Sequence, residues 1–299
     1  MQSQSGFFRG PSEDFTNMFS SLEPVHTSGS GFTLLYRSRK GGRNRLYKCL
    51  KDDLREDSLY ENLLRKEFEI GYMLSHPGIC EYYAFTEIPQ LGHCIEMEWI
   101  DGKTLYERLQ EGSLPEKTAR KILIELCDAL DYMHHKQIIH RDLKPENIMV
   151  TSNGDNAKII DFVFSDSDSH MLLKAPAGTR MFASPELLNG EEIDCRSDIY
   201  SLGKIMALMP GGFSSIAEKC TQKVREGRYA SASEIKAALH KTGKKFWILA
   251  AVILFMFTAL AYAIILLSAR KAERAVDKMF YETRDMIMDS GFPEPSDQD

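Results

Sequence analysis

Cysteine and tryptophan are scarce in this chain of 299 residues, which contains six cysteines and two tryptophans. The cysteines lie far apart in the sequence and lack the close pairs typical of zinc sites, so we do not expect a zinc site. A small set of unpaired thiols fits a reducing cytosolic compartment.

An excess of positive charge is also absent. The chain has 37 Lys and Arg residues against 43 Asp and Glu residues, which gives a net charge of −6. No basic stripe with interleaved aromatic residues occurs, so we expect no nucleic-acid partner. Residues 1–30 lack a basic-then-apolar leader, so we expect no signal peptide there, and no repeat of solenoid period is visible.

Long apolar runs are absent with one exception. Residues 246–267 form a run of 22 residues without a charged side chain, which at helical rise is long enough to cross a bilayer core. Trp247 lies near one end, where interfacial aromatic residues are common. The alternative is a buried helix of a soluble protein, but such a helix is rarely apolar on all sides at this length. The run therefore predicts one transmembrane helix.

A polar octet between two apolar runs is the most informative segment of the chain. The octet reads His140-Arg141-Asp142-Leu143-Lys144-Pro145-Glu146-Asn147. The runs beside it, Ile138-Ile139 and Ile148-Met149-Val150, are short and rich in β-branched residues, so both are predicted strand ends. A solvated surface loop is the alternative, but it does not explain these eight residues in this order.

A second acidic residue, Asp161, follows fourteen residues after the end of the octet. The turn-rich residues 151–155 lead into Ile159-Ile160 and then Asp161, so we predict a hairpin that brings Asn147 and Asp161 to one sheet edge. Magnesium prefers oxygen ligands and is usually held by one or two protein groups together with substrate phosphates. One carboxylate and one amide suit that metal.

The octet, followed by Asp161-Phe162, resembles the catalytic motifs of protein kinases, and Lys144-Pro145-Glu146 resembles the eukaryotic-like (Hanks-type) serine/threonine branch. The resemblance implies an α+β, bilobal fold with a small, mainly β lobe that contains one helix and a larger, mainly α lobe. It also implies ATP as phosphate donor, Mg²⁺ or alternatively Mn²⁺ as metal, and Ser or Thr hydroxyls of proteins as acceptors.

The resemblance assigns roles to individual residues. Asp142 would orient and deprotonate the acceptor hydroxyl, Lys144 would offset charge on the transferring phosphate, and Asn147 and Asp161 would hold the metal. Lys48, within Leu46-Tyr47-Lys48-Cys49-Leu50, would hold the nucleotide phosphates. A glutamate of the helical segment 59–74 would pair with that lysine; the family register favours Glu67, with Glu69 as the rival.

The adenine and phosphate contacts follow from the same resemblance. Gly29 and Gly31 resemble the start of the glycine-rich loop, but Leu34 stands where a third glycine is usual, and a plain turn is an alternative. Met97 would lie at the back of the adenine pocket, with the backbone of Glu98 to Ile100 facing the base. Residues 98–101 would form the hinge.

Three further residues are implied to be structural. Asp198 would brace the catalytic loop, and Glu186 would form a buried ion pair with Arg228. Arg141 would bind a phosphate on the activation segment, with Thr179 among the acceptors. The other acceptors would be Ser165, Ser167 and Ser169, although a flexible acidic loop is the alternative for these serines.

Two departures from the family pattern leave two function classes open. Val163 replaces the glycine after Asp161-Phe162, and Leu34 replaces the third loop glycine. These changes fit a membrane-tethered pseudokinase or scaffold that binds nucleotide without turnover. Retention of every charged catalytic group favours an active kinase with a signalling role, because phosphoryl transfer depends mainly on positioning and electrostatics.

The predicted order along the chain is an N-terminal arm (1–26), a kinase-like domain (27–240), a basic juxtamembrane linker (241–245), the transmembrane helix (246–267) and a short extracytoplasmic tail (268–299). The small lobe would cover 27–97 and the large lobe 102–240. Basic residues are equally frequent on both sides of the span, so they do not predict its orientation. Because ATP is cytosolic, we expect the kinase-like domain to lie in the cytosol. A single-pass protein of a bacterial inner membrane is favoured over an endomembrane protein. The tail is expected to be a helical extension or a frayed end, with a homodimer paired through its rough heptad pattern as a further alternative.

Overall fold

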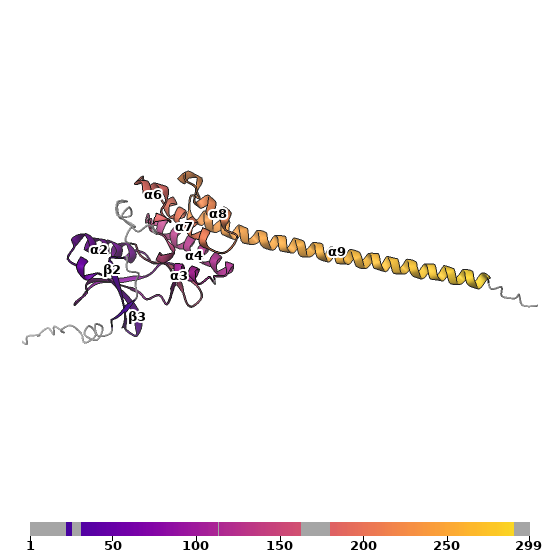
Figure 1. Ribbon diagram of the computed structural model, residues 1–299, viewed down its shortest axis with the longest axis horizontal. Coiled ribbons are helices and arrows are strands. Elements are labelled where there is room, and N and C mark those ends of the chain that lie inside the picture. The colour runs from indigo at the N-terminus through magenta and orange to yellow at the C-terminus, as the bar shows by residue number, and fades with distance from the viewer. Residues whose placement is uncertain (1–21, 26–30, 113, 163–179, 290–299) are drawn as a thin grey trace, which may run out of the picture. The chain divides into compact units, whose positions relative to one another are not determined.

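The computed structural model describes residues 22–25, 31–112, 114–162 and 180–289. The chain divides into two compact units, Met1–His240 and Lys241–Asp299. The first unit contains a strand-rich lobe, with α2 beside it, and a helical lobe (Figure 1). One continuous hydrophobic core runs through both lobes, from Leu64 and Ile95 to Leu126 and Ile205.

The small lobe is a five-stranded antiparallel sheet in the order β1-β2-β3-β5-β4. Its strands are β1 (Glu23–Val25), β2 (Thr33–Lys40), β3 (Arg43–Leu50), β4 (Tyr82–Ile88) and β5 (Gly92–Glu98). Gly41 and Gly42 join β2 to β3, and both have positive φ, the backbone conformation that a tight hairpin requires and that glycine adopts without strain.

One helix crosses the small lobe. After the 3-10 turn η1 (Asp52–Leu54), α2 (Ser58–Tyr72) begins at the N-cap Asp57, whose side chain accepts a hydrogen bond from the backbone N–H of Leu59. Leu63, Glu67 and Ile70 recur at helical spacing and are buried. The buried face of α2 therefore contains a carboxylate among apolar residues.

The large lobe is built on α4 (Glu116–His135), whose buried residues recur at helical spacing. A three-stranded sheet precedes and follows this helix, made of β6 (Gly102–Thr104), β7 (Ile148–Thr151) and β8 (Ala157–Ile159). Between β6 and α4, α3 (Leu105–Gln110) begins with a capping box between Thr104 and Glu107. The hairpin predicted after Asn147 is thus β7–β8.

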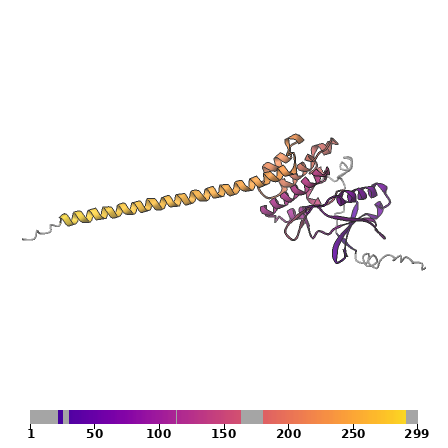
Figure 2. The same ribbon diagram turned by 180° about the vertical axis from the view of Figure 1, so that it is seen from behind.

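The described part of this lobe also contains helices shorter than α4. They are α6 (Pro185–Asn189), α7 (Arg196–Leu208), α8 (Ser214–Cys220) and the 3-10 turns η2 (Pro145–Asn147) and η4 (Arg225–Gly227), and Figure 2 shows the same lobe from behind. The prediction of a strand end at Ile138-Ile139 is wrong, because these residues follow the end of α4 and lie outside any strand.

The last helix, α9 (Ala232–Asp289), begins inside the first unit, where Ala232, Ile235 and Leu239 are fully buried. Part of it, Val252–Met286, is long and apolar enough to cross a membrane by length and composition. That stretch overlaps the predicted span over residues 252–267. The helical extension, one of the alternatives for the tail, is the one that the structure shows as far as Asp289.

Candidate active site

Lys48 and Glu67 form a buried ion pair between β3 and α2. The Lys48 Nζ lies 2.7 Å from Glu67 Oε1, and the Glu67 side chain is fully buried. Glu69, the rival for this place, is exposed on the other side of α2. The helical spacing that buries Leu63 and Ile70 also points Glu67 toward the sheet.

Burial governs the charge of this pair. Burial raises the pKa of Glu67 to about 6, and the Lys48 ammonium offsets part of that rise. Burial alone would lower the pKa of Lys48, but the carboxylates of Asp161 and Glu67 outweigh it and raise that pKa above its ordinary value. At neutral pH the lysine is therefore a fixed positive charge held between two carboxylates.

The loop from His140 to Asn147 gathers three of the predicted catalytic groups. Lys144 Nζ donates to Asp142 Oδ2 at 2.7 Å, and Asn147 Nδ2 donates to the same oxygen at 3.0 Å and to the Asp142 carbonyl at 2.9 Å. Burial raises the pKa of Asp142 above its ordinary value, while Lys144 offsets part of the rise. The carboxylate is thus fixed by two donors on one oxygen, which leaves Oδ1 for an incoming hydroxyl.

The β7–β8 hairpin carries Asn147 and Asp161 to the same edge. Ile148 pairs with Ile159 across the hairpin, and the backbone N–H of Ile160 donates to the Asn147 carbonyl at 3.0 Å. Asp161 Oδ1 lies 3.3 Å from Lys48 Nζ, which joins this edge to the Lys48–Glu67 pair. Asp161 also has a positive φ of 68°, a backbone strain of the kind that concentrates at functional sites.

Asp198 braces the catalytic loop from α7. Its two carboxylate oxygens accept hydrogen bonds from the backbone N–H groups of His140 at 2.8 Å and Arg141 at 2.9 Å. Burial alone would raise the pKa of Asp198, but its contact with His134 and the backbone donors lower it below its ordinary range. Arg141 is held at a positive φ of 67°, so the carboxylate stabilises a strained turn.

The sequence model of the protein kinase domain family matches residues 27–248. The chain belongs to the protein kinase family. Relatives include a probable serine/threonine-protein kinase of Streptomyces coelicolor, 38% identical over 179 residues, which covers 55% of this chain and 26% of the relative. Serine/threonine-protein kinase PknB of Mycobacterium leprae is 36% identical over 168 residues, covering 53% of this chain and 27% of that protein. The match thus spans only about a quarter of either relative.

The kinase fold itself is supported by a solved structure. The kinase domain of Mycobacterium tuberculosis PknI superposes with a TM-score of 0.57 at 21% identity, covering 73% of this chain and 93% of that one. The predicted fold, a β-sheet lobe and a helical lobe followed by one long apolar helix, is confirmed.

The kinase domain has residues that fit a magnesium ion. The Asp161 carboxylate is about one-third exposed, and the Asn147 amide nitrogen donates to Asp142, so the amide oxygen is the atom that Asn147 could offer to a metal. A carboxylate and an amide oxygen beside substrate phosphates are the ligands that Mg²⁺ accepts. Within residues 22–25, 31–112, 114–162 and 180–289, no group of three or more His, Cys, Asp or Glu residues could hold a metal ion.

Met97 and Glu98 are the last two residues of β5, and the other predicted hinge residues come directly after that strand. Met97 is buried in the main core, and Ile100 is half-buried against it. The backbone N–H of Glu98 donates to the Glu81 carbonyl at 2.8 Å, while its carboxylate accepts from Lys158 Nζ at 2.8 Å. The Glu98 side chain is therefore held against β8, and its backbone carbonyl accepts a weak hydrogen bond from Cys80 Sγ at 3.9 Å. The predicted contact of residues 98–100 with a base stays a prediction.

Of the two loop glycines, only Gly31 lies among the described residues. It is exposed, and a Cβ built there would meet nothing nearer than the Thr33 backbone nitrogen at 4.0 Å. Protein packing alone therefore does not require glycine at this position. Gly29 lies outside the described residues, as do Val163, Thr179 and the serines predicted to face Arg141.

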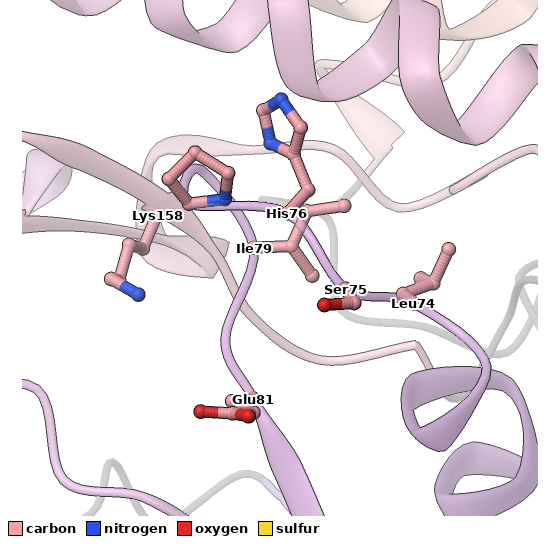
Figure 3. A pocket seen from close by; sticks show the side chains of 7 residues that line it. Leu74, Ser75, His76, Ile79, Glu81 and Lys158 are labelled. Atoms are coloured by element: carbon pink, nitrogen blue, oxygen red, sulfur yellow. The ribbon is translucent and has the colours of Figure 1, made fainter.

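A hollow of about 240 Å³ lies beside the segment that joins α2 to β4 (Figure 3). It is lined by the segment from Leu74 to Ile79 together with Glu81 and Lys158. Lys48, Asp142 and Asp161 do not line it, so this hollow is separate from the candidate nucleotide site.

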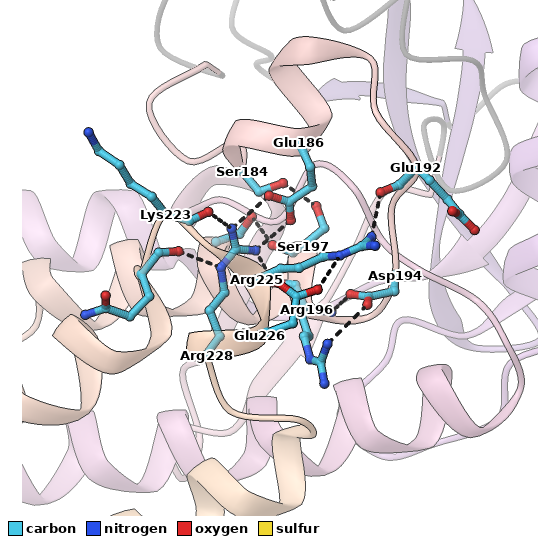
Figure 4. A network of polar contacts seen from close by, with 12 residues as sticks. Ser184, Glu186, Glu192, Asp194, Arg196, Ser197, Lys223, Arg225, Glu226 and Arg228 are labelled. Carbon is cyan, nitrogen blue, oxygen red and sulfur yellow. Dashed lines mark hydrogen bonds and ion pairs between the residues drawn. The ribbon is translucent and has the colours of Figure 1, made fainter.

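Glu186 and Arg228 form a bidentate ion pair away from the catalytic loop (Figure 4). The Arg228 Nη1 and Nη2 atoms donate to Glu186 Oε1 at 2.6 Å and Oε2 at 2.8 Å. Three backbone carbonyls, those of Arg196, Gln222 and Lys223, accept the other donations of the guanidinium. Burial alone would raise the pKa of Glu186, but the Arg228 contact lowers it.

Removal of one partner of this pair is expected to destabilise the kinase domain. Arg228→Ala should lower the free energy of unfolding by about 3–5 kcal/mol, because it leaves the Glu186 carboxylate and three carbonyls without their donor. Urea denaturation of the full chain measures the change. Arg225→Ala is the matched control, since Arg225 contacts exposed Glu226 and the Glu192 carbonyl at the surface, and it should leave the free energy of unfolding near the wild-type value. Equal losses in the two variants would contradict a structural role for the pair.

Sequence reasoning missed His134, whose Nε2 lies 2.8 Å from Asp198 Oδ2. It comes from the end of α4 and adds a third contact to the carboxylate that holds the catalytic loop. Its signal in the sequence is weak, because histidine near the end of a helix is ordinary. Only the packing of α4 against α7 makes its role visible.

Proposed function

We propose that this chain is a membrane-anchored serine/threonine protein kinase that transfers the γ-phosphate of ATP to protein hydroxyls in a signalling role. The observation that carries the proposal is the convergence of Lys48, Asp142, Asn147 and Asp161 in one hydrogen-bonded arrangement. These groups supply the positive charge, base and metal ligands that phosphoryl transfer requires.

Each group has a definite task in the proposed reaction. Asp142 accepts the proton of the substrate hydroxyl on the oxygen that Lys144 and Asn147 leave uncontacted. Lys144 offsets negative charge near the transferring phosphate, and Lys48, fixed by Glu67, positions the nucleotide. Mg²⁺, bound by Asn147 and Asp161, would neutralise charge on the nucleotide phosphates.

A pseudokinase that binds nucleotide without turnover is the second candidate. It is favoured by Leu34, which stands on β2 opposite Cys49 and packs into a small apolar cluster with Tyr47 instead of offering a third flexible glycine. The charged groups are nevertheless all retained, and catalysis depends mainly on them.

Transfer from radiolabelled ATP separates the two candidates. The purified chain in detergent, with Mg²⁺ and a mixed protein acceptor, should produce phosphoserine or phosphothreonine, and Asp142→Asn should remove about 99% or more of that signal, as loss of a general base does. A signal of equal size in both proteins, or none in either, would contradict the proposed activity. Binding of nucleotide without transfer would favour the pseudokinase.

The membrane anchor rests on α9. Val252, Leu254, Phe255, Phe257, Leu260 and Ile264 are all largely exposed, so the helix is apolar on every side over this stretch. A surface of this kind is unfavourable in water and favourable in hydrocarbon. Named relatives come from bacteria, which supports a bacterial inner membrane, with the kinase domain in the cytosol where ATP is present.

Alkaline extraction of membranes tests the anchor. The full chain should remain in the membrane pellet at high pH, whereas a variant with three lysines, at Leu254, Phe257 and Leu260, should move to the supernatant, because a charge at the centre of a span costs about 3 kcal/mol. Release of the full chain at high pH would mean that α9 does not span, and retention of both proteins would mean that this stretch of α9 is not what holds the chain in the membrane. The same preparations, cross-linked in detergent, show whether two copies pair.

A further inference from the structure

Gly71 and Tyr82 fit each other where α2 packs on β4. Gly71 lies one helical turn after Glu67, and a Cβ built on it would lie 2.6 Å from the Tyr82 ring. Real Cβ atoms do not approach aromatic carbons so closely, so only glycine leaves room for this ring. Tyr82 is in turn almost fully buried. A glycine inside a helix is less favourable than alanine, and this contact gives the packing reason for the glycine at position 71.

The position of the ring places its hydroxyl on the catalytic pair. The Tyr82 hydroxyl donates to Glu67 Oε1 at 2.9 Å, the same oxygen that accepts from Lys48 Nζ at 2.7 Å. The other carboxylate oxygen, Oε2, is buried and has no hydrogen-bond partner in the described part of the chain. Glu67 is therefore held through one oxygen by two donors, one from β3 and one from β4.

The other side of the Tyr82 ring contacts the segment that carries Asp161. The ring centroids of Tyr82 and Phe162 lie 5.7 Å apart in a tilted arrangement, and Phe162 is fully buried. Phe162 also packs on His140, with centroids 5.6 Å apart. One side chain thus touches α2, the residue after Asp161, and through it the catalytic loop.

We propose that Tyr82 is a positioning residue that fixes Glu67 on Lys48, with Gly71 as the recess that admits its ring. This inference rests on the proposed kinase function. The Tyr82 hydroxyl orients the Glu67 carboxylate, and the Tyr82 ring keeps Phe162 packed. Glu67 of α2 and Asp161 are thereby both held in contact with Lys48. A leucine or valine on β4 could fill space beside a larger residue at position 71, but it could not donate to Glu67.

The test removes the hydroxyl and keeps the ring. Tyr82→Phe should weaken binding of a fluorescent ADP analogue with Mg²⁺ to the full chain in detergent about 10-fold and lower kcat by a similar factor, with KM for the protein acceptor unchanged. Loss of a hydrogen bond to a charged group has effects of this size. The matched control is Tyr83→Phe on the same strand, where the ring stacks under Arg45, and it should behave as wild type.

A double-mutant cycle shows whether the effect passes through Glu67. In a Glu67→Gln background, Tyr82→Phe should change nucleotide affinity by less than about 2-fold, because the two residues act as one unit. An equal loss in both backgrounds, or wild-type affinity for Tyr82→Phe, would overturn the proposal. If Tyr82→Phe does not fold, Gly71→Ala replaces it in the cycle, since the added methyl displaces the same ring.

Nucleotide binding separates this inference from the proposed activity. If the wild-type chain transfers no phosphate but Tyr82→Phe lowers its nucleotide affinity, the kinase proposal is wrong and the positioning role stands. If the wild-type chain is active but Tyr82→Phe changes neither nucleotide affinity nor kcat, the positioning role is wrong and the kinase proposal stands.

Discussion

Asp161→Asn is expected to lower phosphoryl transfer by about 100- to 1000-fold, the effect of removing one preorganised charged group from a reacting phosphate site. The substitution keeps the size of the side chain but removes the charge that lies 3.3 Å from Lys48 and faces the proposed metal. The Mg²⁺ concentration needed for half-maximal nucleotide binding should rise with it. Fluorescence titration of the analogue at several Mg²⁺ concentrations measures that shift.

Asp155→Asn is the matched control for this prediction. Asp155 lies in the turn of the same β7–β8 hairpin and pairs with Arg108 at 2.9 Å, away from Lys48. Its loss should leave transfer and Mg²⁺ dependence near wild type. If Asp161→Asn behaves like Asp155→Asn, the carboxylate after β8 does not hold the metal.

Lys48→Met is expected to destabilise the kinase domain by about 3–5 kcal/mol at neutral pH, because it leaves Glu67 as a buried charge without its partner. The pKa of Glu67, about 6 in the wild type, should rise further. Between pH 4.5 and the raised pKa of folded Glu67, this carboxyl binds a proton in the folded chain more often than in the unfolded chain. The free energy of unfolding of the variant therefore falls as pH rises through this range and recovers as pH falls. Urea denaturation at pH 5 and pH 7.5 should show the larger deficit at pH 7.5.

Lys40→Met controls for loss of a lysine on the same sheet. Lys40 is half-exposed and pairs with Glu96, which keeps Arg45 as a second partner. Its removal should change stability by less than about 1 kcal/mol at both values of pH. A Lys48→Met deficit that is equal at pH 5 and pH 7.5 would mean that lost packing, and not a stranded carboxylate, causes the loss.

The catalytic loop could be placed from sequence because its chemistry constrains residue type and spacing together. Asn147 and Asp161 flank the short apolar strands β7 and β8, and the hairpin that these strands form leaves little freedom in register. The family register separated Glu67 from Glu69, and the structure gives the physical reason: Glu67 shares the buried face of α2 with Leu63 and Ile70.

Other features depend on contacts between distant segments and left no local pattern. The fit of Tyr82 against Gly71, and the approach of His134 to Asp198, are set by how whole elements pack. The continuation of α9 beyond residue 267 can be explained from the local sequence, although these residues are not apolar. No glycine or proline interrupts residues 268–289, so a helix can continue after the apolar run has ended.

A crystal structure with Mg²⁺ and a non-hydrolysable ATP analogue tests the central claim most directly. The account predicts a metal ion with the Asn147 amide oxygen and an Asp161 carboxylate oxygen at about 2.0–2.1 Å, and Lys48 Nζ in contact with a phosphate oxygen. A bound nucleotide with both side chains turned away from its phosphates would contradict it.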